Sequence, residues 1–313
     1  MKKIIGVNTS HNASACLLEN GIVKEYWDED RLLNKKDWIP EISPPTKELF
    51  CLNKIFDDEV EMIAYACPEY TGSYKVPENV HKKYEFKPYF FDSKKHHLYH
   101  AICGFYFSPF KEATCIVIDG GGSEPYEPGY REIESIISIN KNYYTELYKK
   151  LSIRNNLSVP YGAGQISDFF LRKKRDGCIL DFTLEACGGL LYDMYSYRLG
   201  FFAKEGTAEV GKLMGLSSYL NKEKEHNLDK ERVQLAAEVQ EESLKRLCYL
   251  IKSAREVNKS KNIILSGGCA LNCVNNFKVV KEFPELNFFV DPIPHDGGTA
   301  IGVAKYIYDY SQR

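Results

Sequence analysis

The stretch that decides the fold is KIIGVNTSHNASACLLENGIVKEYW, residues 3–27. It is apolar and β-branched up to a polar turn at Ser10-His11-Asn12, and residues 13–18 are apolar again. Glu19-Asn20-Gly21 is a strong β-hairpin signal, and residues 22–27 have the composition of another strand. The stretch therefore predicts three consecutive strands joined by tight turns, with His11 in the first turn.

The same pattern recurs from residue 113. Residues 113–118 are an apolar run, Asp119-Gly120-Gly121-Gly122 forms a turn, and residues 132–139 and 143–148 have strand composition. Two copies of one unit indicate a duplicated α/β fold. This outline is similar to the actin-like (ASKHA) ATPase fold, whose two RNase H-like halves hold a nucleotide in the cleft between them. We assign residues 1–112 to the first half and 113–313 to the second, with the last helix packing back on the first half.

Two later strands each precede a glycine turn and a helix. Residues 262–265 run into Ser266-Gly267-Gly268, and residues 287–290 precede Asp296-Gly297-Gly298 and a last helix that ends near Tyr308. A strand followed by a glycine turn and a helix places backbone N–H groups where a phosphate binds. Helices are also predicted over residues 94–107 and 229–257, the latter from its apolar periodicity.

The composition is that of an ordinary globular protein. The 313 residues are 44% hydrophobic and 27% charged, and the formal net charge is −2 at pH 7. A net charge this close to zero does not indicate a nucleic-acid-binding protein, and no apolar run is long enough to span a membrane. The ten cysteines form no CxxC pair, which is typical of reduced thiols in the cytoplasm, where we place the protein. The basic run at residues 172–175 is interpreted as a solvated helix end.

Two histidines and two aspartates predict a metal site. His96 and His100 are four residues apart on a predicted helix, so they project from one helix face. Asp119 and Asp296 each stand at a glycine turn. Two imidazoles and two carboxylates suit iron(II), manganese or zinc without choosing among them. The alternatives are two surface histidines, a turn-forming Asp119 and an Asp296 that caps the last helix.

Seven motifs follow one another over nearly the whole chain. They are Gly6 with His11–Ala15, Asp28–Arg31, His96–Ala101, Asp119–Gly122, Gly211–Tyr219, Gly267–Cys273 and Asp296–Gly302. In sequence and order these motifs resemble those of the transferase domain in the NodU/CmcH-type O-carbamoyltransferases. The resemblance implies an actin-like fold that handles a nucleotide-activated carbamoyl group.

The resemblance also implies roles for single residues. It implies a divalent metal held by His96, His100, Asp119 and Asp296, which would grip the phosphate of ATP or of carbamoyl-adenylate. Lys212 would neutralise phosphate charge. The nucleoside would contact Asn272. Close backbone approaches to the ligand would come from five glycines, Gly121, Gly267, Gly268, Gly297 and Gly298.

The implied reaction moves a carbamoyl group from carbamoyl-adenylate to a hydroxyl of a small molecule, sugar or nucleotide. The hydroxyl proton needs a base, for which we take His11 because imidazole titrates near neutrality. Glu209 is the candidate to orient this imidazole. The family has Asp after this histidine, whereas this chain has Asn12, which removes a charge beside the proposed base.

The predicted partners follow from the same resemblance. Relatives continue into a C-terminal YrdC-like domain that makes carbamoyl-adenylate from carbamoyl phosphate and ATP, whereas this sequence ends at Arg313. We therefore expect either a separate YrdC-like protein or another route to the donor. Assembly of this chain into a homodimer is also left open. Two other functions stay open: a non-catalytic ATP- and metal-binding subunit, and a subunit like the tRNA threonylcarbamoyl transferases. The presence of His11 favours catalysis, and the near-zero charge disfavours tRNA.

Overall fold

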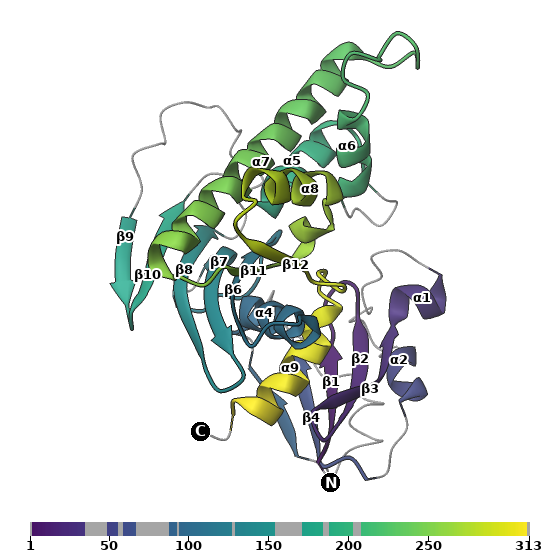
Figure 1. The fold of residues 1–313 in the computed structure, drawn as a ribbon. Helices are drawn as coiled ribbons and strands as arrows, with labels where there is room; N and C mark the ends of the chain where they lie inside the picture. The colour runs from purple at the N-terminus through teal and green to yellow at the C-terminus, as the bar shows by residue number, and fades with distance from the viewer. Residues whose placement is uncertain are drawn as a thin grey trace.

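The structure is a computed structural model that describes residues 2–34, 49–55, 59–66, 88–92, 94–126, 129–153, 171–183, 188–202 and 208–311. Two mixed β-sheets form its framework. Two helices lie between the sheets, and a group of helices that includes the long α7 covers the second sheet (Figure 1).

The first sheet has the strand order β3-β2-β1-β4-β5. Its strands are β1 (Lys3–Asn8), β2 (Ser14–Glu19), β3 (Ile22–Asp28), β4 (Met62–Ala66) and β5 (Tyr89–Phe91). β1, β2 and β3 pair antiparallel in succession, whereas β1, β4 and β5 pair parallel. At the β2–β3 turn, Asn20 and Gly21 have φ of 50° and 82°, the positive values that a tight hairpin turn requires. The three strands predicted from residues 3–27 are therefore confirmed.

The second sheet has the strand order β12-β11-β6-β7-β8-β10-β9. Its strands are β6 (Glu112–Ile118), β7 (Tyr130–Asn140), β8 (Tyr144–Ile153), β9 (Leu171–Arg175), β10 (Cys178–Thr183), β11 (Asn262–Ser266) and β12 (Asn287–Val290). Five of these strands repeat the first sheet. The run β8-β7-β6-β11-β12 has the same two antiparallel and two parallel pairings as β3-β2-β1-β4-β5. The predicted duplication is thus confirmed in strand order and direction.

The basic run at residues 172–175 belongs to a strand and not to a helix. These residues lie in β9, which pairs antiparallel with β10 at the edge of the second sheet. The predicted helix end is wrong because pairing with β10 overrides the local charge pattern. Lys173 and Lys174 are exposed there, and charged side chains on an edge strand discourage pairing with another chain.

Two helices each pack on the sheet that is built from the other half of the sequence. α4 (His96–Phe107) packs on β6, β7 and β11, and α9 (Gly298–Asp309) packs on β1, β2 and β4. The two helices also pack on each other between the sheets (Figure 1). The other helices are α1 (Glu29–Leu33), α2 (Phe50–Lys54), α5 (Gly189–Arg198), α6 (Val210–Ser217), α7 (Lys230–Val257) and α8 (Cys273–Glu282). Within the described ranges, no helix has both the length and the apolar character needed to cross a bilayer.

Glycines allow α9 to approach its neighbours closely. A Cβ added at Gly6 of β1 would lie 1.9 Å from the Ala300 carbonyl oxygen, and one at Gly302 would lie 2.0 Å from that of Tyr99. No side chain fits at such distances, so α9 contacts β1 and α4 almost backbone to backbone. This packing holds the turn before α9 beside the first turn of α4, where the candidate site lies.

Candidate metal centre and ligand cavity

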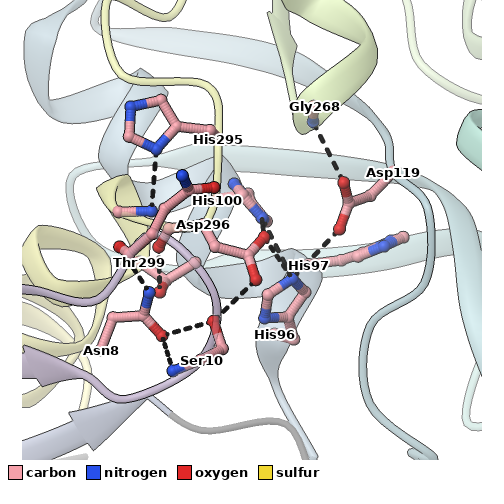
Figure 2. Close-up of polar contacts among 12 residues, drawn as sticks. Asn8, Ser10, His96, His97, His100, Asp119, Gly268, His295, Asp296 and Thr299 are labelled. Atoms are coloured by element: carbon pink, nitrogen blue, oxygen red, sulfur yellow. Dashed lines mark hydrogen bonds and ion pairs between the residues drawn. The ribbon is translucent and has the colours of Figure 1, made fainter. Parts of the chain in front are cut away.

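Four buried side chains from three parts of the chain meet at one point (Figure 2). His96 and His100 come from the first two turns of α4, Asp119 follows β6, and Asp296 precedes α9. His96 Nε2 lies 3.1 Å from His100 Nε2, 3.2 Å from Asp119 Oδ2 and 3.4 Å from Asp296 Oδ1. His100 Nε2 lies 3.5 Å from Asp296 Oδ1. One potential ligand atom of each residue lies within 4.8 Å of all the others.

The start of α4 is fixed by groups outside the helix. Ser123 Oγ accepts a hydrogen bond from His96 N at 3.0 Å, and Glu132 Oε1 accepts one from His97 N at 3.0 Å. The first N–H groups of a helix have no acceptor within it, so these two oxygens satisfy them. The turn that carries His96 is thereby attached to β7, the strand of Glu132.

The two carboxylates are also oriented by their surroundings. Gly268 N donates to Asp119 Oδ1 at 3.2 Å, and Ser10 Oγ donates to Asp296 Oδ2 at 2.8 Å. Asn8 Oδ1 accepts from the N–H of Ser10 at 3.0 Å and so fixes Ser10 in turn (Figure 2). Outer partners of this kind orient the ligands of metal sites.

The spacing of the four side chains fits a divalent ion. Neighbouring ligand atoms about 2.0–2.1 Å from an ion stand about 2.8–3.4 Å apart in octahedral or tetrahedral sites. The pairs measured here are 3.1–3.5 Å apart. Asp296 Oδ1 is buried without a hydrogen-bond partner among the described residues, and a cation at the centre would satisfy it. The ligand chemistry is that of iron(II), manganese or zinc.

The cluster requires a positive charge. Burial lowers the pKa of His96, but Asp296 and Asp119 outweigh burial and raise that pKa to about 10. Burial likewise raises the pKa of both carboxyl groups, but the neighbouring histidines hold each pKa below its ordinary value. The aspartates are therefore ionised near neutral pH. Their charge is offset in part by a protonated His96, and a divalent metal ion in its place would balance it in full.

A cavity of about 490 Å³ borders the cluster. Asp119 and Asp296 form part of its wall together with His11, from the turn between β1 and β2, and His295. Most of the rest of the wall comes from the glycine turn after β6, the turn after β11, helices α5 and α6, and Arg131 of β7. A cavity of this size is typical of sites for small ligands and cofactors.

The turn between β1 and β2 contacts the cluster directly. His11 is partly exposed, and its Nδ1 lies 3.4 Å from Asp296 Oδ2. Asn12 has φ 57°, a left-handed conformation that Asn tolerates, and its amide donates to Asp30 Oδ2 at 2.8 Å. An Asp at position 12 would oppose Asp30 as a like charge, so the local structure explains why Asn fits there.

Glu209 and Lys212 form an ion pair with each other at 2.5 Å. Lys212 lines a separate cavity of about 530 Å³ on the other side of α6, whereas Gly211 and Met214 of the same helix line the cavity beside the cluster. The predicted phosphate contact of Lys212 and the predicted pairing of Glu209 with His11 stay predictions, which this arrangement does not favour.

Asn272 is buried and uses its side-chain amide within the protein. Its Oδ1 caps α8 by accepting from Asn275 N, and its Nδ2 donates to Tyr192 Oη at 2.8 Å and to Gln240 Oε1 at 3.0 Å. Tyr192 lines the cavity, so Asn272 supports the wall of the cavity from behind. Its predicted nucleoside contact stays a prediction, and the geometry favours a supporting role.

The five glycines predicted to approach the ligand differ in their surroundings. Gly121 and Gly268 line the cavity. Gly267 has φ 82°, and a Cβ there would lie 2.4 Å from the Ile118 carbonyl oxygen. A Cβ at Gly298 would lie 2.2 Å from the Ile293 carbonyl oxygen, and one at Gly297 would lie 2.6 Å from Tyr26 Oη. At Gly267 and Gly298 the contact is with backbone, so packing within the protein is enough to require glycine, whereas the neighbours of Gly297 are side chains.

Arg131 and Ser10 are two residues of this region that the sequence did not suggest. Ser10 Oγ holds Asp296, and Arg131, on β7, lines the cavity beside Gly121. Arg131 stands in no charge run or glycine motif, and its one sequence signal is that it directly precedes the strand predicted over residues 132–139.

Comparison with protein families gives one match. Residues 220–305 match the family model of the carbamoyltransferase N-terminus. This part of the chain is thus similar to the carbamoyltransferase N-terminal domain. An uncharacterized protein of Methanocaldococcus jannaschii is 26% identical over 96% of this chain and 56% of its own length. The nodulation protein NolNO of Sinorhizobium fredii is 25% identical over 67% of this chain and 30% of its own length. The chain thus spans about half or less of the length of these relatives.

Solved structures identify the fold. HypF of T. kodakarensis superposes with a TM-score of 0.61 at 12% identity, over 99% of this chain and 48% of its own. A ROK family glucokinase from Streptomyces griseus, solved with glucose and AMPPNP, gives 0.51 at 11% identity over 96% of this chain and 98% of its own. At such identities the likeness concerns the fold alone. The chain has the actin-like ASKHA fold with two α/β halves, as the sequence predicted.

Proposed function

We propose that this chain binds a divalent metal ion and a nucleotide-activated carbamoyl donor, and transfers the carbamoyl group to a hydroxyl acceptor. The observation that carries the proposal is the cluster of His96, His100, Asp119 and Asp296, whose two aspartates form part of the wall of a ligand-sized cavity. The distant relationship to carbamoyltransferases supplies the group that is transferred.

The residues around the cavity have distinct tasks in this proposal. An ion held by the four side chains would polarise an oxygen of the donor and offset its phosphate charge. Gly268 N and Ser10 Oγ keep the two carboxylates in place through the hydrogen bonds described above.

His11 is the candidate base. It lines the cavity, and its side chain is 45% exposed, so an acceptor can reach it. In the proposed step the acceptor oxygen attacks the carbamoyl carbon and forms a new C–O bond. The bond from that carbon to the phosphate oxygen breaks, AMP leaves with the electron pair, and the acceptor proton passes to His11.

The test uses purified protein, preformed carbamoyl-adenylate and a panel of hydroxylated acceptors, with mass spectrometry of the products. Wild-type protein should carbamoylate at least one acceptor, and His11→Ala should lower the rate about a hundredfold, the usual effect of losing a general base. His226→Ala is the matched control, because His226 is exposed and lies outside this cavity. An unimpaired His11→Ala protein would exclude His11 as the base.

The donor is proposed to come from a YrdC-like protein. Carbamoyl phosphate and ATP should then give little product with this chain alone and full activity once that protein is added. Full activity without the partner would mean that this chain also makes its own donor. A protein that binds metal and nucleotide but transfers to no acceptor would instead be a non-catalytic subunit, and carbamoylation of tRNA alone would favour the tRNA-modifying function.

A further inference from the structure

One side chain brings a permanent positive charge to the cavity. Among the described residues that line it, Arg131 is the only lysine or arginine. The other ionisable groups of this wall are aspartates, histidines, tyrosines and a cysteine, and none of these except histidine becomes a cation. Any anionic ligand in the cavity therefore meets its permanent protein cation at Arg131.

The position of Arg131 is set by the glycine turn after β6. A Cβ added at Gly121 would lie 2.7 Å from both Cδ and Nε of Arg131 and 2.8 Å from its Cζ. The end of the arginine side chain thus lies flat against Gly121, and any larger residue at 121 would displace it. This contact gives Gly121 a reason beyond the backbone approach to a ligand that the sequence suggested.

Arg131 is also incompletely paired within the protein. Its Nε is buried and has no hydrogen-bond partner among the described residues. The nearby Asp119 carboxylate is engaged by His96 Nε2 and Gly268 N. A buried N–H group without a protein acceptor is costly unless a ligand supplies one.

We propose that Arg131 binds a phosphate group of the ligand in this cavity, and that it has the task that the sequence suggested for Lys212. The inference rests on the proposed function, since it names the residue that recognises the phosphate of the nucleotide donor. A planar guanidinium makes two parallel hydrogen bonds to phosphate oxygens, which a lysine ammonium cannot do. Lys212 is instead paired with Glu209 beside the other cavity.

Isothermal titration calorimetry with AMP, adenosine and pyrophosphate tests the proposal on the purified full chain. Arg131→Ala should weaken AMP and pyrophosphate binding about 10- to 100-fold, the effect of one charge-assisted contact, and leave adenosine binding unchanged. Arg131→Lys keeps the positive charge but lacks the planar guanidinium with its paired donors, so it should weaken AMP binding less than Arg131→Ala does. Arg175→Ala is the matched control, because Arg175 is 56% exposed and lies on the edge strand β9.

The outcomes separate this inference from the proposed function. Wild-type binding of AMP that persists unchanged in Arg131→Ala would overturn the role of Arg131 and leave the nucleotide site in place. Pyrophosphate binding that depends on Arg131, without any binding of AMP or adenosine, would support the phosphate role and overturn the nucleotide donor. Equal loss of adenosine and AMP binding in Arg131→Ala would mean that the variant damages the cavity as a whole, which would also overturn the specific role.

Discussion

Glu132 forms a buried ion pair with Lys149 of the neighbouring strand β8 and also accepts a hydrogen bond from the first turn of α4, and its replacement by Gln should be costly. Glu132 and Lys149 are both fully buried and in direct contact, and Lys149 also lies 2.9 Å from Glu146. Burial raises the pKa of Glu132, but Lys149 and the hydrogen bonds around the carboxylate outweigh burial and lower it from 4.5 to about 2. Since each pKa unit corresponds to about 1.4 kcal/mol, ionised Glu132 contributes about 3 kcal/mol at neutral pH.

The pH dependence follows from the direction of the two shifts. Because the pKa of Glu132 is lowered on folding, its contribution to the free energy of unfolding is present above pH 4.5. That contribution is lost as the pH falls toward about 2. Burial lowers the pKa of Lys149, but Glu132 and Glu146 outweigh burial and raise it above its ordinary value of 10.5. The contribution of Lys149 to the free energy of unfolding is therefore present below pH 10.5 and is lost only at higher pH. The pair therefore stabilises the protein fully between about pH 5 and pH 10.

Chemical denaturation followed by circular dichroism measures the effect. At pH 7, Glu132→Gln should lower the free energy of unfolding by about 3 kcal/mol, and at pH 2 the difference from wild type should shrink. The Gln carbonyl can still accept from His97 N, so metal content should stay near the wild-type value. Glu285→Gln is the matched control, because Glu285 is 53% exposed in its pair with Arg255 and should change stability by less than about 1 kcal/mol. A loss below about 1 kcal/mol for Glu132→Gln would refute the reasoning.

Two further predictions concern the site itself. His96→Ala and His100→Ala should each release the bound metal, since both imidazoles face one point, and elemental analysis that finds full occupancy in both variants would remove the metal assignment. Gly268→Val should abolish AMP binding in calorimetry without unfolding the protein, because Gly268 lines the cavity and a Cβ there would already lie 3.0 Å from Asp119 Oδ1. Gly215→Val, where a Cβ meets nothing within 4 Å, is the control, and equal AMP binding by wild type and Gly268→Val would contradict the assigned cavity.

The strands and the four candidate metal ligands were accessible from the sequence because short-range signals specify them. Apolar runs of strand length and the Asn20-Gly21 turn fix the first hairpin through local backbone preferences alone. His96 and His100 share a helix face because the helical repeat brings residues four apart together. Glycine turns after buried strands mark Asp119 and Asp296, and the structure brings all four side chains to one point.

The sequence by itself thus determined the duplicated strand pattern and which side chains could form the metal cluster. The tertiary structure alone decided which remaining residues face the cavity. Met214 and Lys212 lie two positions apart on α6, and the helix sends them to different cavities. Arg131 reaches the ligand cavity because β7 pairs beside the turn of Gly121, a contact between strands that no local pattern encodes. Side-chain direction at such positions depends on how helices and sheets pack, and that packing is set by contacts between residues far apart in the chain.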